Sequence, residues 1–467
     1  MSIIDKITKN GLLKSSMIYT ICAFLIKGIN FITFPIFSRM LTPTDYGVTS
    51  VFSTWVGFVI VFGSIQLNSC IPTAKAKFEK NKYEELIITI LSFVTILFCM
   101  LILISILLKN TLSKMIGLSG NLIILMTIQS FFSFISTLYN TILIQDSKDK
   151  KYLVISLLST ILNVLLSIIL VMLMKENEYI GKILGTFIST ILIGLIMYFK
   201  ISRGKFFINK NLLKFAIKIS LPIVPHILSH QVLTSSDRIM LNSFIGSKSV
   251  GIYGFAYNIG MIIQIIWGAI NNAWIPWYFK NMEENNEEKI KKASINYIMG
   301  FTAITILLIF ITPELGKILA PKDYWIGINV VPLVAFSYFF VFLYSFPVNI
   351  QFYKEKTKYI PIGTVLAAIV NILLNYIFIP KYGILAATIS TLISYILLFV
   401  FHMLTVKYLL KYQDINTKYY LISIVAVLIF ILLFYLTIAN LVYRYLILVL
   451  VIAYIYMKKD NLKKLRN

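Results

Sequence analysis

The residues most able to do chemistry in this chain are the few ionisable side chains that interrupt its apolar stretches. Lys27 lies in the middle of the first such stretch, and on a helix Ser16, Ala23, Asn30 and Phe34 fall within about 60° of it. A charge at that depth of a membrane costs several kcal/mol, so it marks a candidate functional position. We therefore expect Lys27, with Asn30 beside it, to face an aqueous cavity and bind an anionic group. The alternative is that Lys27 pairs with a carboxylate on another helix and only fixes packing.

A second group of polar residues lies around position 230. His226, His230, Thr234 and Asp237 fall within about 80° of one another on a helix and form one stripe. Histidine changes charge near neutral pH and carboxylates relay protons, so His226, His230 and Asp237 are candidates for coupling to a proton or cation gradient. The alternative is that Asp237 caps its helix or forms a salt bridge beside Arg238. The two histidines lack a third ligand and an HExxH motif, so no metal site is predicted.

These residues need membrane helices to position them. Of the 467 residues, 58% are hydrophobic and 13% charged, and the mean hydropathy is +0.85. Soluble chains carry about a quarter charged residues, and a helix needs about 20 apolar residues to cross a bilayer. We therefore predict an all-α polytopic membrane protein with fourteen transmembrane helices. The predicted spans are 17–37, 47–68, 86–108, 122–144, 152–174, 179–199, 213–235, 250–272, 294–313, 328–352, 359–380, 383–406, 419–438 and 441–457.

The distribution of positive charge predicts the orientation of these spans. With the N-terminus in the cytoplasm, 31 Lys and Arg residues fall in or next to cytoplasmic segments, 10 fall in or next to external ones, and Lys27 and Arg238 are counted with neither side. Such a bias is typical of membrane proteins, and it predicts that both termini are cytoplasmic. The net charge of +24 then indicates contact with anionic membrane lipids, and no nucleic-acid partner is expected.

An internal repeat with an offset of 204 residues organises the spans. Gly47 corresponds to Gly251 and Pro72 to Pro276, so the distance from glycine to proline is 25 residues in both copies. The offset covers six spans, which gives the two halves the same orientation. We predict a six-helix lobe over residues 1–200, a second over 201–412, and two additional helices with a basic tail over 413–467. Lys27 then corresponds to Gln231, so polar stripes of the two lobes would face one another.

Enzyme chemistry and cofactors are not predicted. The chain has no GxxxxGK[ST], GxSxG or HExxH motif, and no GxGxxG in a strand–helix context. Cys22, Cys70 and Cys99 are far apart and lie in or at the ends of apolar runs, so we expect three unpaired thiols. Arg39 and Arg238 lie near the outer ends of two spans, where each is either a gate residue or an interfacial anchor.

Several motifs resemble those of polysaccharide-biosynthesis flippases, and they follow the same order along the whole chain. The residues that carry the resemblance are Arg39, Leu41–Gly47, Ser220–His226, Asp237–Leu241, Val250–Tyr253 and Asn271–Trp277. The chain is similar to Wzx-type members of the multidrug/oligosaccharidyl-lipid/polysaccharide exporter superfamily. The resemblance implies a MATE-like fold, with two six-helix lobes around a central cavity and two further helices.

The resemblance also implies a function. Such proteins move undecaprenyl-pyrophosphate-linked oligosaccharide repeat units across the bacterial cytoplasmic (inner) membrane by alternating access, for O-antigen or capsule, sometimes beside a polysaccharide polymerase complex. Substrate-binding candidates are Lys27, Asn30, Arg39, Gln231 and Arg238, with no cofactor. A multidrug exporter would instead need acidic residues in its cavity. A membrane-embedded polymerase or ligase would need a large external loop, and a peptidoglycan-precursor flippase several arginines in the first lobe.

Overall fold

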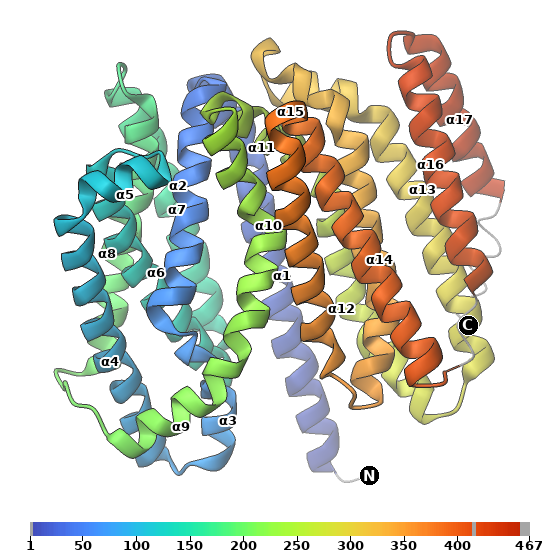
Figure 1. The fold of residues 1–467 in the computed structure, drawn as a ribbon. Helices are drawn as coiled ribbons and strands as arrows, with labels where there is room; N and C mark the ends of the chain where they lie inside the picture. Colours follow the sequence, from blue (N-terminus) through green and yellow to red (C-terminus); the bar gives the residue numbers. More distant parts are fainter. Residues whose placement is uncertain (1–2, 413–416, 458–467) are drawn as a thin grey trace. The chain divides into compact units, whose positions relative to one another are not determined.

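The described part of the chain is built from α-helices. In this computed structural model the backbone is described for residues 3–412 and 417–457, and the side chains for residues 18–412 and 417–453. Within these ranges α-helices are joined by short turns and 3₁₀ segments, and no strand occurs (Figure 1). The predicted all-α fold class is confirmed. The predicted basic tail, residues 458–467, lies outside the described residues.

The chain divides into two compact units, residues 1–251 and residues 252–467. The helices of the first unit have short connections, so neighbours in sequence are often neighbours in space. They are α1 (Ile3–Met40), α2 (Pro43–Ser64), α3 (Ile71–Lys77), α4 (Lys80–Leu107), α5 (Lys109–Ile116), α6 (Gly120–Gln145), α7 (Asp149–Leu173), α8 (Glu178–Ser202), α9 (Lys210–Ser220) and α10 (Val224–Phe244).

The second unit continues the same architecture. Helix α11 (Ser247–Gly260) runs across the division between the units, and the remaining helices follow in order. They are α12 (Ile262–Glu283), α13 (Glu287–Leu319), α14 (Val331–Tyr353), α15 (Tyr359–Leu404), α16 (Thr417–Thr437) and α17 (Leu441–Met457).

These units do not coincide with the predicted lobes, whose boundary was placed at residue 200. Helices α9 and α10 belong to the first unit, where α9 packs against α4 and α10 packs against α2. The two compact units are defined by contacts between helices, whereas the predicted lobes were defined by the repeat in the sequence. The lobe boundaries therefore stay a prediction.

Twelve helices in the described residues are long and apolar enough to cross a membrane. They cover thirteen of the fourteen predicted spans, and the shorter apolar helix Leu441–Ala453 covers the fourteenth. Many large apolar side chains on these helices are exposed, as expected of surfaces that face lipid. The chain is thus a multi-pass helical membrane protein.

The numbers twelve and thirteen differ because α15 contains two spans. A straight helix of 46 residues would be about 69 Å long, more than twice the thickness of a bilayer core. Gly383 has φ 56° and ψ −129°, a conformation that breaks the helix and that glycine adopts readily. The chain folds back at Gly383, and the two segments lie close enough that Asn371 Nδ2 donates to Thr391 Oγ1 at 3.4 Å. The predicted separation of spans 359–380 and 383–406 matches this hairpin.

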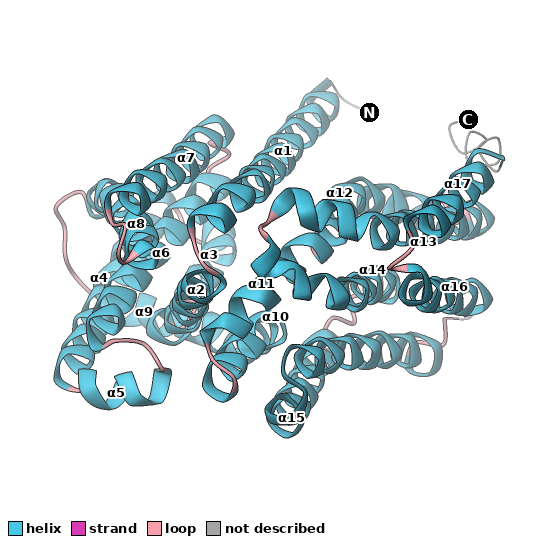
Figure 2. Ribbon diagram, turned by 90° about the horizontal axis from the view of Figure 1, so that it is seen from above, coloured by secondary structure: helices cyan, strands magenta, loops and turns pink. Residues whose placement is uncertain are grey.

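The two C-terminal helices pack on α13 within the second unit, where α13, α16 and α17 lie side by side (Figure 2). Arg444 of α17 is only 3% exposed. Its Nη1 and Nη2 donate to the two carboxylate oxygens of Glu314 at 2.9 and 2.7 Å, and Nη1 also donates to the Phe310 carbonyl at 3.1 Å. A bidentate pair in apolar surroundings fixes both position and rotation of α17.

Small residues set the tightest helix contacts of the first unit. On α8, the Gly181-x-x-x-Gly185 pair meets α7 so closely that a Cβ at Gly185 would lie 2.4 Å from the Ser167 Cα. Such close approach is the usual role of small residues four apart in membrane helices. It fixes which face of α8 points away from α7.

A reciprocal contact joins the first turns of α2 and α11. A Cβ built on Gly47 would lie 1.8 Å from the Ser247 carbonyl oxygen, and one on Gly251 would lie 1.8 Å from the Pro43 carbonyl oxygen. The pairs Pro43/Ser247 and Gly47/Gly251 are each 204 residues apart. The contact therefore has the register of the sequence repeat, and both of its glycines are needed for the approach.

Candidate functional site

A cavity lined by cationic and polar side chains lies within the first unit, and we call it the cationic cavity. Its volume is about 290 Å³. Its lining comes from α2, α8 and α10 and includes two positive charges but no carboxylate. The lining residues are Tyr46, Thr49, Ser50, Ser53, Thr54, Lys182, Gln231, Ser235 and Arg238.

Lys182 is held in this cavity by aromatic rings. Its Nζ lies 4.1 Å from the centroid of the Tyr46 ring and 4.7 Å from that of Phe37. An ammonium over aromatic faces gains on the order of 1 kcal/mol or more when partly desolvated. Among the described residues no acidic side chain forms an ion pair with Lys182. The rings position the cation without neutralising it, which leaves its charge for a ligand.

Helix α10 supplies the opposite wall. Gln231, Ser235 and Arg238 are spaced by four and three residues, which places them on one helix face. Gln231 lies against Gly57 of α2, where a Cβ would come within 2.6 Å of the Gln231 Nε2. The glycine thus lets the amide reach the cavity. Ser53 Oγ donates to its own helix, to the Thr49 carbonyl at 2.9 Å. Lys182 and Arg238 are the two cationic side chains of this lining, and Gln231 adds an amide.

A second cavity of the first unit is polar but uncharged, and we call it the neutral cavity. Its volume is about 360 Å³, and its walls come from α1, α6, α7 and α8. The lining residues are Ile26, Asn30, Ser133, Ser136, Asn140, Tyr152, Ser156, Ser159, Thr160, Asn163, Ser189, Thr190, Ile193 and Met197. Asn140 Oδ1 and Ser156 Oγ are buried and have no hydrogen-bond partner among the described residues. A hydroxyl-rich ligand is the chemistry that such a lining matches.

Both cavities use the same face of α8. Lys182 lines the cationic cavity, and Ser189 and Ile193 line the neutral one. Positions seven and eleven residues beyond Lys182 return to within about 20° of its direction on a helix. Seven residues correspond to about 10 Å along the axis. One elongated ligand with an anionic end and a polar uncharged body would therefore meet complementary chemistry along this face.

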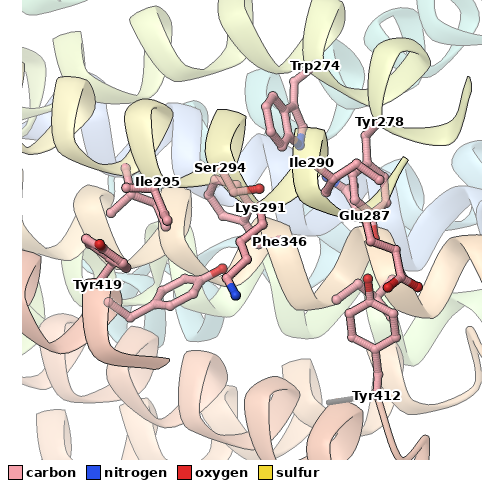
Figure 3. Close-up of a pocket in the computed structure, with 14 residues that line it drawn as sticks. Trp274, Tyr278, Glu287, Ile290, Lys291, Ser294, Ile295, Phe346, Tyr412 and Tyr419 are labelled. Atoms are coloured by element: carbon pink, nitrogen blue, oxygen red, sulfur yellow. The ribbon is translucent and has the colours of Figure 1, made fainter. Parts of the chain in front are cut away.

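A small pocket of the second unit is too small for such a ligand. Its volume is about 50 Å³, room for one or two water molecules. It is lined by aromatic side chains of several helices, with Glu287 and Tyr412 at one end and Tyr419 at the other (Figure 3). We assign it no substrate.

Comparison with known proteins places the chain in a family. Residues 12–282 match the family described as "Polysaccharide biosynthesis protein", which is more than half of the chain. The chain belongs to this family. A Haemophilus influenzae protein described as "Uncharacterized membrane protein" is 22% identical over 376 residues, 77% of this chain and 88% of the relative. Another from the same organism, "Lsg locus putative protein 1", is 21% identical over 374 residues, 77% of this chain and 89% of the relative.

Two solved structures share the fold of this chain. "Lipid II flippase MurJ, inward closed conformation" superposes with a TM-score of 0.74 at 16% identity, covering 95% of this chain and 99% of that one. An inward-facing multidrug resistance MATE family transporter superposes with a TM-score of 0.64 at 16% identity, covering 84% and 96%. The predicted MATE-like fold and the resemblance to polysaccharide-biosynthesis proteins are thus confirmed, whereas the Wzx-type subtype stays a prediction.

The predicted substrate-binding residues lie in different parts of the structure. Gln231 and Arg238 meet in the cationic cavity, and Asn30 lines the neutral cavity. Lys27 is exposed on α1 and lines neither cavity. Arg39 donates from Nη1 to the Pro35 carbonyl at 2.8 Å, within its own helix. Binding of substrate by these five residues stays a prediction.

The predicted ion-coupling residues lie on α10 in different surroundings. His226 is half-buried, His230 is exposed, and Asp237 is 1% exposed. The hydroxyl of Thr234, on the same predicted stripe, donates to the His230 carbonyl at 2.9 Å and so bonds to its own helix. None of the three ion-coupling candidates lines the cationic or the neutral cavity. Their role stays a prediction.

Sequence analysis missed Lys182. It falls near the outer end of a predicted span, where a lysine resembles an ordinary interfacial residue. The available signal was its position between Gly181 and Gly185, which must face α7 closely and so constrain where Lys182 points. Tyr46 of the Asp45-Tyr46-Gly47 motif, one of its two aromatic partners, is far away in sequence.

Proposed function

We propose that this protein is a Wzx-type flippase for oligosaccharide repeat units linked to undecaprenyl pyrophosphate. It would carry them across the bacterial cytoplasmic membrane for O-antigen, capsule or another surface polymer, by alternating access coupled to an ion gradient. The single observation that carries the proposal is the cationic cavity, where Lys182 and Arg238 face a space lined by no carboxylate. A pyrophosphate needs such charge-assisted donors.

The neutral cavity supports the same substrate. Its Asn, Ser and Thr side chains offer donors and acceptors without charge, which suits the hydroxyls of sugar rings. The shared face of α8 would let a pyrophosphate and the sugars attached to it contact both cavities. The positive charge of the connecting segments supports cytoplasmic termini.

A cation or drug exporter of the same fold is the second candidate. A cationic substrate needs acidic residues in its cavity, and neither the cationic nor the neutral cavity is lined by one. This observation favours the flippase. The proposal also includes contact with a polysaccharide polymerase complex, and only the proposed function supports this contact.

The test is complementation of a strain that lacks this protein, with surface polysaccharide as the readout. Removing one charge-assisted hydrogen bond costs about 1.5–3 kcal/mol, so Lys182→Ala is expected to weaken substrate binding roughly 10- to 150-fold and reduce polymer. Lys175→Ala is the matched control, because Lys175 lies exposed on the connection just before α8 and outside the cavity. Normal polymer with Lys182→Ala at matched expression would refute the anion-binding role of the cavity.

The same assay decides between Lys27 and Lys182. Lys27→Ala reduces polymer if the exposed lysine of α1 binds substrate in another conformation, and leaves it unchanged if Lys182 alone has this role. Ion coupling is tested separately in liposomes: flipping that continues unchanged after the pH and sodium gradients are collapsed would exclude His226, His230 and Asp237 as coupling residues.

A further inference from the structure

A large crevice lies at the end of the first unit where α3 meets the start of α4, the end of α6, the start of α7 and the end of α8. We call it the basic crevice. Its volume is about 830 Å³, the largest of the cavities described above. Seven of its lining residues are Lys or Arg and three are Asp or Glu, so it carries an excess of positive charge. Because the crevice lies at the ends of membrane helices, we expect it at the depth of the lipid headgroups.

Part of this charge is paired within the protein. Asp146 accepts from Lys75 Nζ at 2.7 Å and from Lys148 Nζ at 2.7 Å. Burial raises the pKa of Asp146, but the hydrogen bonds from Lys148 and Lys75 outweigh it and hold that pKa below its usual range. Arg203 Nη1 forms a second ion pair with Glu84 at 2.9 Å. These contacts fix three cations at the rim of the crevice.

The other cations of the basic crevice have no such partner. Among the described residues, the remaining four lysines of its lining form no ion pair. These four are Lys80, Lys151, Lys200 and Lys205. One carboxylate of the described lining, that of Glu85, is also outside these ion pairs. The crevice therefore presents an uncompensated charge that an external anion of two or three charges would balance.

A buried polar atom also lines the basic crevice. Tyr83 is only 4% exposed, and its hydroxyl has no hydrogen-bond partner among the described residues. Lys75 Nζ lies 4.8 Å from the centroid of its ring. A buried hydroxyl without a partner is unfavourable, and a ligand oxygen that accepts a hydrogen bond from it would remove that cost. This observation is independent of the lysines and adds a neutral donor to the lining of the crevice.

The crevice is also held in shape. The segment after α8 that carries Lys205 is tied to α4, because the backbone amides of Phe207 and Asn209 donate to Ser92 Oγ and Thr89 Oγ1, each at 3.2 Å. Both hydroxyls are buried on α4. The wall that faces Lys200 and Lys205 is thus part of the packed unit, and the lysines need not be ordered from a free loop before they bind.

We propose that the basic crevice binds the pyrophosphate headgroup of a polyprenyl lipid in the adjoining leaflet, at a site separate from the cationic cavity. The inference rests on the proposed function, since a flippase must first collect its lipid from one leaflet. The unpaired lysines and the Tyr83 hydroxyl bind the pyrophosphate, and the apolar tail stays in the bilayer. Ordinary anionic phospholipids carry a single phosphate charge and match this excess less well.

The experiment measures binding of undecaprenyl pyrophosphate to purified full-length protein by native mass spectrometry. All variants carry Lys182→Ala, so that the cationic cavity contributes little. The crevice variant is Lys80→Gln/Lys200→Gln/Lys205→Gln, and its matched control is Lys289→Gln/Lys292→Gln/Lys356→Gln, three exposed lysines of the second unit. Each exposed ion pair contributes little by itself, so the loss of three lysines is expected to lower the affinity of the crevice variant roughly tenfold and that of the control almost not at all.

Further arms identify the ligand. Inorganic pyrophosphate and phosphatidylglycerol are expected to bind at least tenfold more weakly than undecaprenyl pyrophosphate. Tyr83→Phe, which keeps the ring, is expected to lower the affinity for undecaprenyl pyrophosphate several-fold. Equal affinity of the crevice and control variants would overturn the proposal, as would free pyrophosphate or phosphatidylglycerol that binds as tightly as the lipid. The proposed function is judged by a different readout, polymer at the surface with Lys182→Ala alone, so the two ideas fail separately.

Discussion

Substitution of Gly47 by alanine tests the contact between the first turns of α2 and α11. The Cβ of the new residue would lie 1.8 Å from the Ser247 carbonyl oxygen and 2.7 Å from its carbonyl carbon. An ordinary contact begins near 3.4 Å, so the two helix ends must separate by about 1.6 Å. Both neighbours are backbone atoms, which cannot rotate out of the way as a side chain can.

The magnitude follows from the cost of overpacking. Forcing an extra methyl group into a tight contact costs about 1–3 kcal/mol. Only the conformation in which the two helix ends touch suffers this cost, whereas one in which they separate does not. Gly47→Ala is therefore expected to shift the equilibrium away from the closed contact by roughly 5- to 150-fold. Gly251→Ala should act in the same direction, because its Cβ meets the Pro43 carbonyl oxygen at the same distance.

The assay is cysteine cross-linking across the contact. Thr44 and Lys248 are exposed, one on each helix, and are again 204 residues apart. In a background without Cys22, Cys70 and Cys99, a short bifunctional reagent should join Thr44→Cys to Lys248→Cys at a rate that reports how often the helix ends touch.

Gly47→Ala is expected to slow this reaction at least fivefold. The control is Gly28→Ala on α1, because a Cβ there has no atom within 4 Å. An unchanged cross-linking rate with Gly47→Ala, in protein that is folded and at matched expression, would refute the reasoning.

Three further predictions concern stability. Arg444→Met leaves the Glu314 carboxylate without its partner in apolar surroundings, so thermal unfolding in detergent should show a loss of about 3 kcal/mol that the Arg444→Met/Glu314→Gln double variant largely restores. Thr42→Ala removes the side chain that accepts from the third residue of α2 and should cost about 1 kcal/mol by the same measurement. The pKa of Asp146 is lowered in the folded protein, so its ion pairs stabilise fully at neutral pH, and this stabilisation should disappear as pH falls through the lowered pKa; Asp146→Asn should lack that acid-dependent part.

Much of the fold could be predicted because bilayer thickness and hydropathy constrain helices locally. The fourteen predicted spans correspond to helical segments, and the turn inside α15 falls between the predicted spans 359–380 and 383–406. The register of the repeat was also readable, since Gly47 and Gly251 are fixed positions in the sequence. The helices depend on neighbours within about one helix length, and the repeat depends only on spacing along the sequence.

The site could be predicted only in part, because a cavity depends on which faces of distant helices meet. Gln231 and Arg238 were candidates by their chemistry, and the structure brings them together with Lys182, a residue that resembled an interfacial lysine in the sequence. Lys27 was the most prominent charge in the sequence, yet it is exposed and lines neither polar cavity. Whether a residue lines a cavity or faces away from it depends on the rotation of its helix about the helix axis. The chemistry of the side chain alone does not predict that rotation.

The sequence by itself determined that the chain is a multi-pass helical membrane protein with a repeat of 204 residues, because length, hydropathy and spacing are properties of the chain. The tertiary structure alone decided that Lys182 lies over Tyr46 in a cavity without carboxylates, and that four lysines of separate segments remain unpaired around one crevice. The physical reason is that electrostatic interactions act through space at a few ångströms. Apart from Lys200 and Lys205, which are five positions apart, the residues concerned are separated by tens to more than a hundred positions along the chain.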